Sequence, residues 1–138
     1  EKNIPVILED LFRGAGNVED KGFNPKTPAL LAEAGIPVSF RVSEGSWYTP
    51  GAGEAGGDLL ETAAFAVKYG MPEEDALKAV TITAARIAGV DDRVGSIEAG
   101  KDADILILRG HPFKVRSIPE AVLIDGKLVY KRTEGSRR

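Results

Sequence analysis

Carboxylates placed directly after strand-like segments are the residues of this 138-residue chain best suited to chemistry. Glu9 and Asp10 follow the apolar run Ile4–Leu8, and Glu44 comes shortly after a second apolar run, Ile36–Val42. A pair of carboxylates at a strand end can bind a substrate or a cation, or it can simply be the polar end of a strand. The residues themselves leave both interpretations open.

The loop after the second apolar run contains two more candidates. Trp47 and Tyr48 could cover a substrate pocket, or they could pack the loop against the fold, as large aromatic side chains commonly do. Residues 51–56 spell GAGEAG, a literal match to the dinucleotide motif G-x-G-x-x-G. That motif requires a strand directly before it and a helix directly after it. Eight residues separate this one from Val42, so we interpret it as a loop.

Histidine and cysteine are too scarce for a metal site built by this chain alone. There is one histidine, His111, and no cysteine. This composition excludes a His-x-His pair, a cysteine-ligated metal and a disulfide. His111 lies between Gly110 and Pro112, and we interpret it as a structural turn residue.

Composition narrows the range of partners. The formal net charge is −3 with acidic and basic residues interspersed, which argues against nucleic acid as a partner. No apolar run approaches the ~20 residues that a membrane-spanning helix needs, so we expect no membrane partner. The length suits one domain with a sizeable core.

Strand and helix patterns alternate in the first half of the chain. The runs Ile4–Leu8 and Ile36–Val42 are separated by a short helical segment, Pro28–Ala34, and Leu59–Tyr69 forms the next helix after an N-cap at Asp58. This order predicts parallel βαβ units. The second helix carries an apolar stripe that should pack on the sheet. The stripe consists of Leu60, Ala63, Ala64 and Val67.

The second half of the chain has the clearest local pattern. Pro72, followed by three acidic residues, favours the start of a helix, and Thr83–Ala88 forms another. Ile105–Leu108 is an apolar run of strand length. Ala121–Tyr130 predicts two antiparallel strands joined by a tight turn at Asp125-Gly126.

Three motifs in this half resemble the C-terminal end of metal-dependent amidohydrolases of the imidazolonepropionase-like group. They are ALKAVTITAARIAG at Ala76–Gly89, GSIEAGKDADILIL at Gly95–Leu108 and VLIDGKLV at Val122–Val129. Upstream, Pro28–Phe40 and Leu59–Gly70 resemble the last barrel units of that family. The resemblance covers nearly the whole chain, but only about the last third of a typical member of this barrel family.

The resemblance implies an α/β fold made of the last strand–helix units of a TIM-type (β/α)8 barrel plus the C-terminal strands of a small β-sandwich. We expect residues 1–94 to form the barrel segment, 95–131 the strands of the small composite β-domain, and 132–138 a frayed basic tail. Such a barrel takes ~250 residues. The chain begins at Glu1 with a strand almost at once, so we expect a piece of a longer polypeptide or a processed product.

The resemblance also implies a catalytic metal in the parent family. Members hydrolyse C–N bonds with one or two divalent metals, zinc among them, held by His-x-His, further histidines and an Asp after the last strand. Ser43 stands here where that Asp would be. A serine hydroxyl is a poor zinc ligand and no general base near neutral pH. We therefore expect no metal in this chain, with Glu44 as the alternative carboxylate.

Two functions follow from the resemblance. The first is a fragment or subunit of an amidohydrolase acting on cyclic amides or peptide-like C–N bonds, inactive alone. The alternative is a non-catalytic binding or interaction module on the amidohydrolase scaffold. Because an incomplete barrel leaves strand edges open, we expect a homo-oligomer or association with the missing N-terminal part of the barrel. Ile4–Leu8 and the hairpin Ala121–Tyr130 are the expected contact surfaces.

Overall fold

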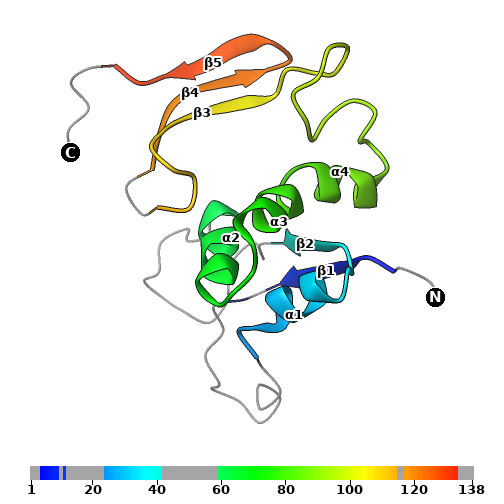
Figure 1. Ribbon diagram of the computed structural model, residues 1–138. Coiled ribbons are helices and arrows are strands. Elements are labelled where there is room, and N and C mark those ends of the chain that lie inside the picture. The colour runs from blue at the N-terminus through cyan, green and yellow to red at the C-terminus, as the bar shows by residue number, and fades with distance from the viewer. Residues whose placement is uncertain (1–3, 10, 12–23, 42–58, 115–116, 134–138) are drawn as a thin grey trace, which may run out of the picture.

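The computed structural model describes residues 4–9, 11, 24–41, 59–114 and 117–133. A two-stranded sheet and its helices form one layer, and a three-stranded sheet lies across a gap from them (Figure 1). The elements, in chain order, are β1 (Val6–Glu9), α1 (Thr27–Glu33), β2 (Val38–Arg41), α2 (Leu59–Lys68), α3 (Glu73–Ala79), α4 (Ile82–Ala88), β3 (Ile105–Arg109), β4 (Ile118–Ile124) and β5 (Lys127–Lys131). The overall class is mixed α/β.

The first sheet is the parallel pair that the sequence predicts. β1 pairs with β2 in parallel, with Val6 opposite Val38 and Glu9 opposite Arg41. The helix α1 lies between them in sequence and makes the crossover that a parallel connection requires. On β2, Val38, Ser39 and Phe40 are all buried, because helices contact this strand on both sides. The prediction of a parallel βαβ unit is confirmed.

The packing of α2 differs in part from the predicted stripe. Ala63 is fully buried and Val67 packs against the core, as expected. Leu60 and Ala64 instead line a cleft that faces the second sheet. Their burial therefore depends on a second layer, which the 3.6-residue periodicity does not reveal. Asp58, the predicted N-cap, lies outside the described residues.

The core between the helices is built from small side chains. Five buried alanines belong to the core cluster of the described residues, which lets the helices and β2 approach closely. They are Ala29, Ala63, Ala66, Ala76 and Ala79. The Ser39 hydroxyl on β2 donates a hydrogen bond to the Ala79 carbonyl at 2.9 Å, so it satisfies a carbonyl at the end of α3.

The second sheet is antiparallel with the order β3-β4-β5, and the predicted hairpin is confirmed. Asp125 and Gly126 both have positive φ, 52° and 70°, as a type I′ turn requires. The Asp104 carboxylate accepts a hydrogen bond from the Asp125 N–H at 2.8 Å, and the Ala103 carbonyl accepts one from the Gly126 N–H at 3.1 Å. The segment before β3 therefore anchors the β4–β5 turn.

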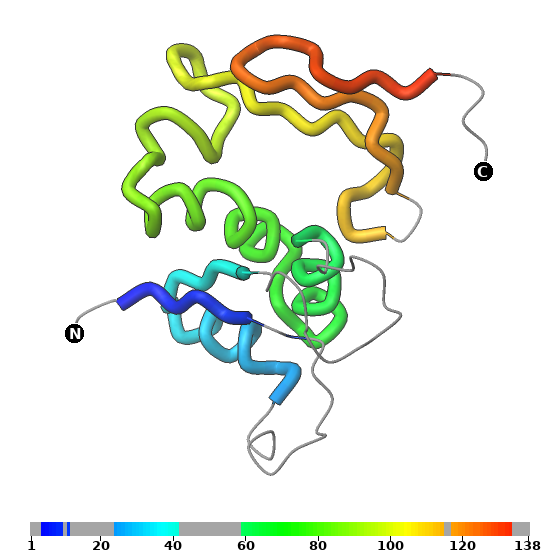
Figure 2. Tube along the Cα trace, turned by 180° about the vertical axis from the view of Figure 1, so that it is seen from behind, coloured from blue at the N-terminus to red at the C-terminus, as the bar shows by residue number. Residues whose placement is uncertain are grey.

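The two layers touch mainly at the ends of the gap between them. In the view from behind, the three-stranded sheet stands apart from the helices along its length (Figure 2). At one end the layers are joined by the segment between α4 and β3; at the other, Phe113 packs against the helical core. Within the described part of the chain, no helix combines the length and apolar character that crossing a membrane would take.

Candidate functional site

The carboxyl ends of β1 and β2 bring one predicted residue next to one that the sequence did not single out. Glu9 faces its register partner Arg41, and a guanidinium nitrogen (Nη1) of Arg41 lies 3.7 Å from Glu9 Oε2. The side chains are 38% and 68% exposed, respectively. Because both side chains are exposed, their charges are accessible to a ligand. An exposed ion pair of this kind contributes little to the stability of the fold.

The neighbouring guanidinium also decides which ligand Glu9 suits. A positive charge beside a carboxylate disfavours a metal cation at the same place. The sequence leaves two roles for Glu9, binding a substrate or binding a cation. The neighbouring Arg41 favours the first, contact with a polar group of a substrate. The sequence does contain a signal for Arg41 as a candidate site residue. It lies at the end of the second apolar run, Ile36–Val42, and parallel pairing places that end beside the end of the first strand.

The remaining predicted site residues fall outside the described residues. These are Asp10, Ser43, Glu44, Trp47 and Tyr48, together with the glycine-rich segment 51–56. Their proposed roles stay predictions from the sequence.

His111 makes the contacts of a turn residue. Its Nδ1 accepts a hydrogen bond from the Phe113 N–H at 3.3 Å, and its Nε2 lies 3.3 Å from Glu73 Oε2 at the start of α3. Across the described ranges, no three or more His, Cys, Asp or Glu side chains come together as a metal site. The metal of the family that the sequence resembles therefore does not fit the described residues.

A cleft of about 1180 Å³ separates the helical layer from the second sheet. Its walls are largely apolar and come from α2, α3 and β3. They include Leu60, Phe65, Leu77, Val80, Leu106 and Leu108. Apolar side chains therefore line the cleft from both the helical side and the sheet side.

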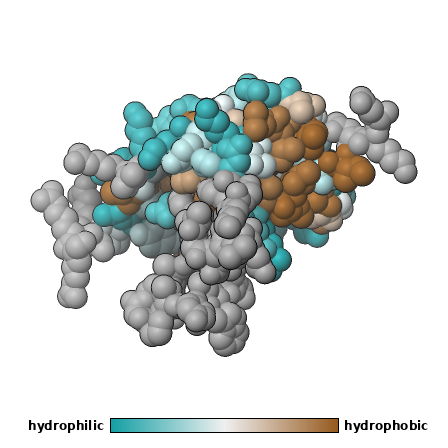
Figure 3. Space-filling view, turned by 90° about the horizontal axis from the view of Figure 1, so that it is seen from below, coloured by the Kyte–Doolittle hydropathy of each residue, from teal (hydrophilic) through white to brown (hydrophobic). Residues whose placement is uncertain are grey.

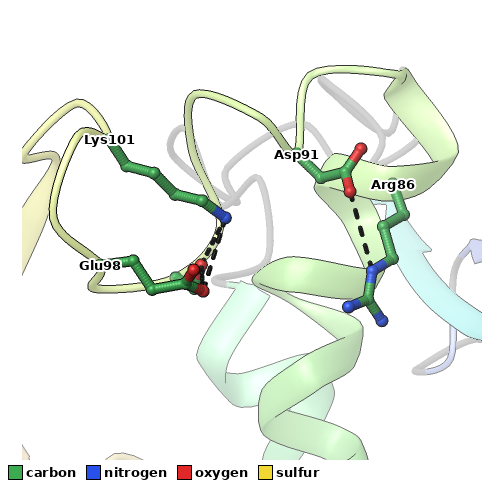
Figure 4. Close-up of polar contacts among 5 residues, drawn as sticks. Arg86, Asp91, Glu98 and Lys101 are labelled. Atoms are coloured by element: carbon green, nitrogen blue, oxygen red, sulfur yellow. Dashed lines mark hydrogen bonds and ion pairs between the residues drawn. The ribbon is translucent and has the colours of Figure 1, made fainter.

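The segment 89–104 joins α4 to β3 and is called the corner below. A polar network links its side chains (Figure 4). Lys101 Nζ donates to the Ser96 hydroxyl at 2.6 Å and lies 3.6 Å from Glu98 Oε1, while the Ser96 hydroxyl donates to Glu98 at 2.6 Å. Nearby, Arg86 Nε lies 3.8 Å from Asp91 Oδ2. Because the partners of Lys101 are all within the corner, this network is structural.

A second ion pair closes the same corner. Arg93 donates to the Asp102 carboxylate at 2.5 Å, and the Asp102 N–H donates to the Arg93 carbonyl at 2.8 Å. Together these bonds join the two ends of the segment and set the direction in which β3 leaves the helical layer.

The corner gives stability a specific dependence on pH. The hydrogen bond from Ser96, with the charge of Lys101, holds the pKa of Glu98 below its ordinary value. A depressed carboxyl pKa stabilises the fold above the unfolded-state pKa and loses that contribution as pH falls through the folded-state pKa. Glu98→Gln should therefore lower Tm near neutral pH, with a difference that shrinks as the pH falls below the ordinary pKa of a glutamate. Thermal unfolding followed by circular dichroism across this range measures it; a difference constant with pH would contradict the assignment.

Comparisons with known proteins place the chain in a family. Residues 22–129 match the sequence model of the Amidohydrolase family. The chain belongs to the amidohydrolase family. Within that family it is 32% identical, over 114 residues, to the imidazolonepropionase of Clostridium tetani, covering 78% of this chain and 27% of that protein.

A second imidazolonepropionase and a solved amidohydrolase structure agree with this assignment. The imidazolonepropionase of Thermoplasma volcanium is 35% identical over 85 residues, which cover 56% of this chain and 21% of that one. The crystal structure of an amidohydrolase from Thermotoga maritima MSB8 superposes with a TM-score of 0.79 at 36% identity, over 94% of this chain and 32% of that chain. The chain thus spans 21% to 32% of the length of these relatives.

Proposed function

We propose that this chain is the C-terminal portion of an amidohydrolase: the last two strands of a (β/α)8 barrel with their helices, followed by strands of a composite β-domain. The parallel pair β1–β2, with its α1 crossover and the helices after β2, supports the barrel assignment. The antiparallel sheet β3–β5 supports the second part. The boundary falls in the corner that begins after Gly89.

We propose further that the complete protein hydrolyses C–N bonds in cyclic amides or peptide-like amides. A bound divalent metal would lower the pKa of its water and so supply the nucleophile. Within this chain, Glu9 and Arg41 lie where barrel enzymes place their functional groups, at the carboxyl ends of parallel strands. Arg41 suits an anionic group of the substrate, and Glu9 suits an N–H donor of the amide.

The open surfaces of the chain support dependence on another polypeptide. Among the residues that the structure describes, no further strand pairs with the outer edges of β1 and β2, and the cleft has apolar walls. Seen from below, apolar side chains gather on the side of the molecule where β1 lies (Figure 3). Ile4, Ile7 and Leu30, in and beside β1 and α1, are 66%, 54% and 51% exposed. We propose that the rest of the barrel, or a second copy of this chain, covers these surfaces.

Ser43 favours the alternative function, a binding or interaction module that keeps the scaffold without catalysis. The serine stands, by resemblance, where the family has its metal-binding Asp. Both functions predict that the isolated chain is inactive, so they separate only when the rest of the barrel is supplied.

The first test uses the isolated chain. We expect no stoichiometric zinc by elemental analysis after dialysis, and no zinc-stimulated hydrolysis of cyclic amides above the buffer rate. The physical reason is a single histidine, no cysteine and Ser43 at the expected ligand position. One equivalent of tightly held zinc that is lost in Glu44→Ala would contradict the proposal and assign the metal to Glu44.

A further inference from the structure

The turn between β4 and β5 contains the one Asp-Gly pair of the sequence. Asp125 is followed by Gly126, and no Asn-Gly pair occurs anywhere in the chain. The Asp125 side chain is 73% exposed, and both residues have positive φ. Because glycine has no Cβ, nothing on residue 126 shields its backbone nitrogen from the carboxyl group of the preceding residue. This pair is therefore the position best suited to a reaction between a side chain and the backbone.

The reaction open to an Asp-Gly pair is isomerisation of the aspartate through a cyclic imide. The Gly126 nitrogen forms a bond to Asp125 Cγ and gives up its proton, and one oxygen of the carboxyl group leaves as water. A second water molecule then attacks the main-chain carbonyl carbon of Asp125 and breaks its bond to the Gly126 nitrogen. The chain now continues through the side chain, as isoaspartate. One water is lost and one is taken up, so the reaction needs no other reagent.

The fold holds both backbone N–H groups of this turn. The Gly126 N–H donates to the Ala103 carbonyl at 3.1 Å, and the Asp125 N–H donates to the Asp104 carboxylate at 2.8 Å. The nitrogen that would attack is thus held by its own hydrogen bond, and the backbone is fixed on both sides of the Asp125 side chain. Attack requires the turn to change its backbone conformation, so the reaction proceeds from a locally opened turn.

We propose that Asp125 is a site of isoaspartate formation, and that the hydrogen bonds to Ala103 and Asp104 set its rate. Both acceptors lie in the corner, so the turn reacts when it detaches from the corner. Conversion adds one carbon to the backbone of the turn, which removes the register that brings the Gly126 N–H to Ala103. An aged chain therefore loses the link between the corner and the hairpin.

The proposal depends only on contacts within the described residues. The two acceptors and the turn all belong to this chain. It is therefore independent of the proposed hydrolytic function and of the strands that complete the second sheet.

The test incubates the full chain at physiological temperature and pH and follows the tryptic peptide 117–127. Liquid chromatography with electron-transfer fragmentation distinguishes isoaspartate from aspartate, which has the same mass. The reference is a synthetic peptide of the same eleven residues, which has neither Ala103 nor Asp104 to hold the turn. We expect Asp125 to convert roughly tenfold more slowly in the chain than in the peptide, because opening the turn breaks hydrogen bonds. Equal rates would overturn the role of the anchors.

The matched variants change the acceptor of the Asp125 N–H. Asp104→Ala removes it and should raise the rate severalfold, toward that of the peptide. Asp104→Asn keeps a carbonyl oxygen in the same place and should stay near the wild-type rate. Circular dichroism checks that each variant is folded; if the alanine variant is not, the comparison of chain with peptide decides alone. A folded alanine variant as slow as the wild type, or no conversion at Asp125 while the peptide converts fully, would overturn the proposal.

Discussion

Changing Ser43 to Asp is expected to raise hydrolysis by about 10²- to 10⁴-fold in a hybrid enzyme whose C-terminal third is this chain. The hybrid takes the preceding part of the Thermotoga maritima amidohydrolase, which this chain matches over 32% of its length at 36% identity. That part would supply the strands that the chain lacks, while position 43 would supply the last carboxylate. Serine cannot act as a general base near neutral pH, whereas aspartate can.

The matched control is Ser43→Asn, which has nearly the shape of aspartate without its charge. We expect the asparagine hybrid to stay at the serine level in initial-rate assays with zinc. Full activity of the serine hybrid would mean that the chain supplies its carboxylate elsewhere, and Glu44→Ala would then identify it. A folded aspartate hybrid without any gain would contradict the placement of Ser43 and favour the non-catalytic module.

The second large effect concerns Gly95, in the corner between α4 and β3. A Cβ at this position would lie 2.7 Å from Ala85 Cβ and 3.0 Å from Ile82 Cα, and the backbone φ is +92°. Both the clash with α4 and the left-handed conformation oppose any other residue. We expect Gly95→Ala to lower the free energy of unfolding by about 3 kcal/mol.

Gly100 provides the control because its backbone also has a positive φ, but no atoms crowd the position that a Cβ would take. Its φ is +94°, and a Cβ there would meet nothing within 4 Å. Gly100→Ala should cost about 1 kcal/mol, the conformational part alone. Urea unfolding of both variants measures the difference, with the slope checked for two-state behaviour. Equal losses in the two variants would show that the contact with α4 does not constrain the corner.

The elements that the sequence predicts correctly are those with local signals. Asp125-Gly126 carries the turn chemistry of a hairpin, and both residues have the positive φ that this turn needs. The two apolar runs around α1 have strand length, and a helix between them forces a parallel pairing. These signals need no knowledge of distant parts of the chain.

The features that escaped prediction depend on contacts distant in sequence. Periodicity predicts that Leu60 and Ala64 pack on the first sheet, because it identifies an apolar face but not the layer that this face meets. Arg41 acquires interest only through its register with Glu9. The crowding at Gly95 comes from α4, and a glycine in a polar turn gives no hint of it. For the candidate site, the sequence predicts Glu9, whereas Arg41 becomes a candidate only through its register in the structure.

The central claim, that this chain is an amidohydrolase segment dependent on further polypeptide, is tested most directly by light scattering with size-exclusion chromatography. The chain is measured alone at several concentrations, then with the separately expressed preceding part of the Thermotoga maritima enzyme. We predict that the chain alone self-associates as its concentration rises, through an interface above ~1,000 Å², and that with the added part it forms a one-to-one complex. A stable monomer at micromolar concentration that ignores the added part would contradict the account.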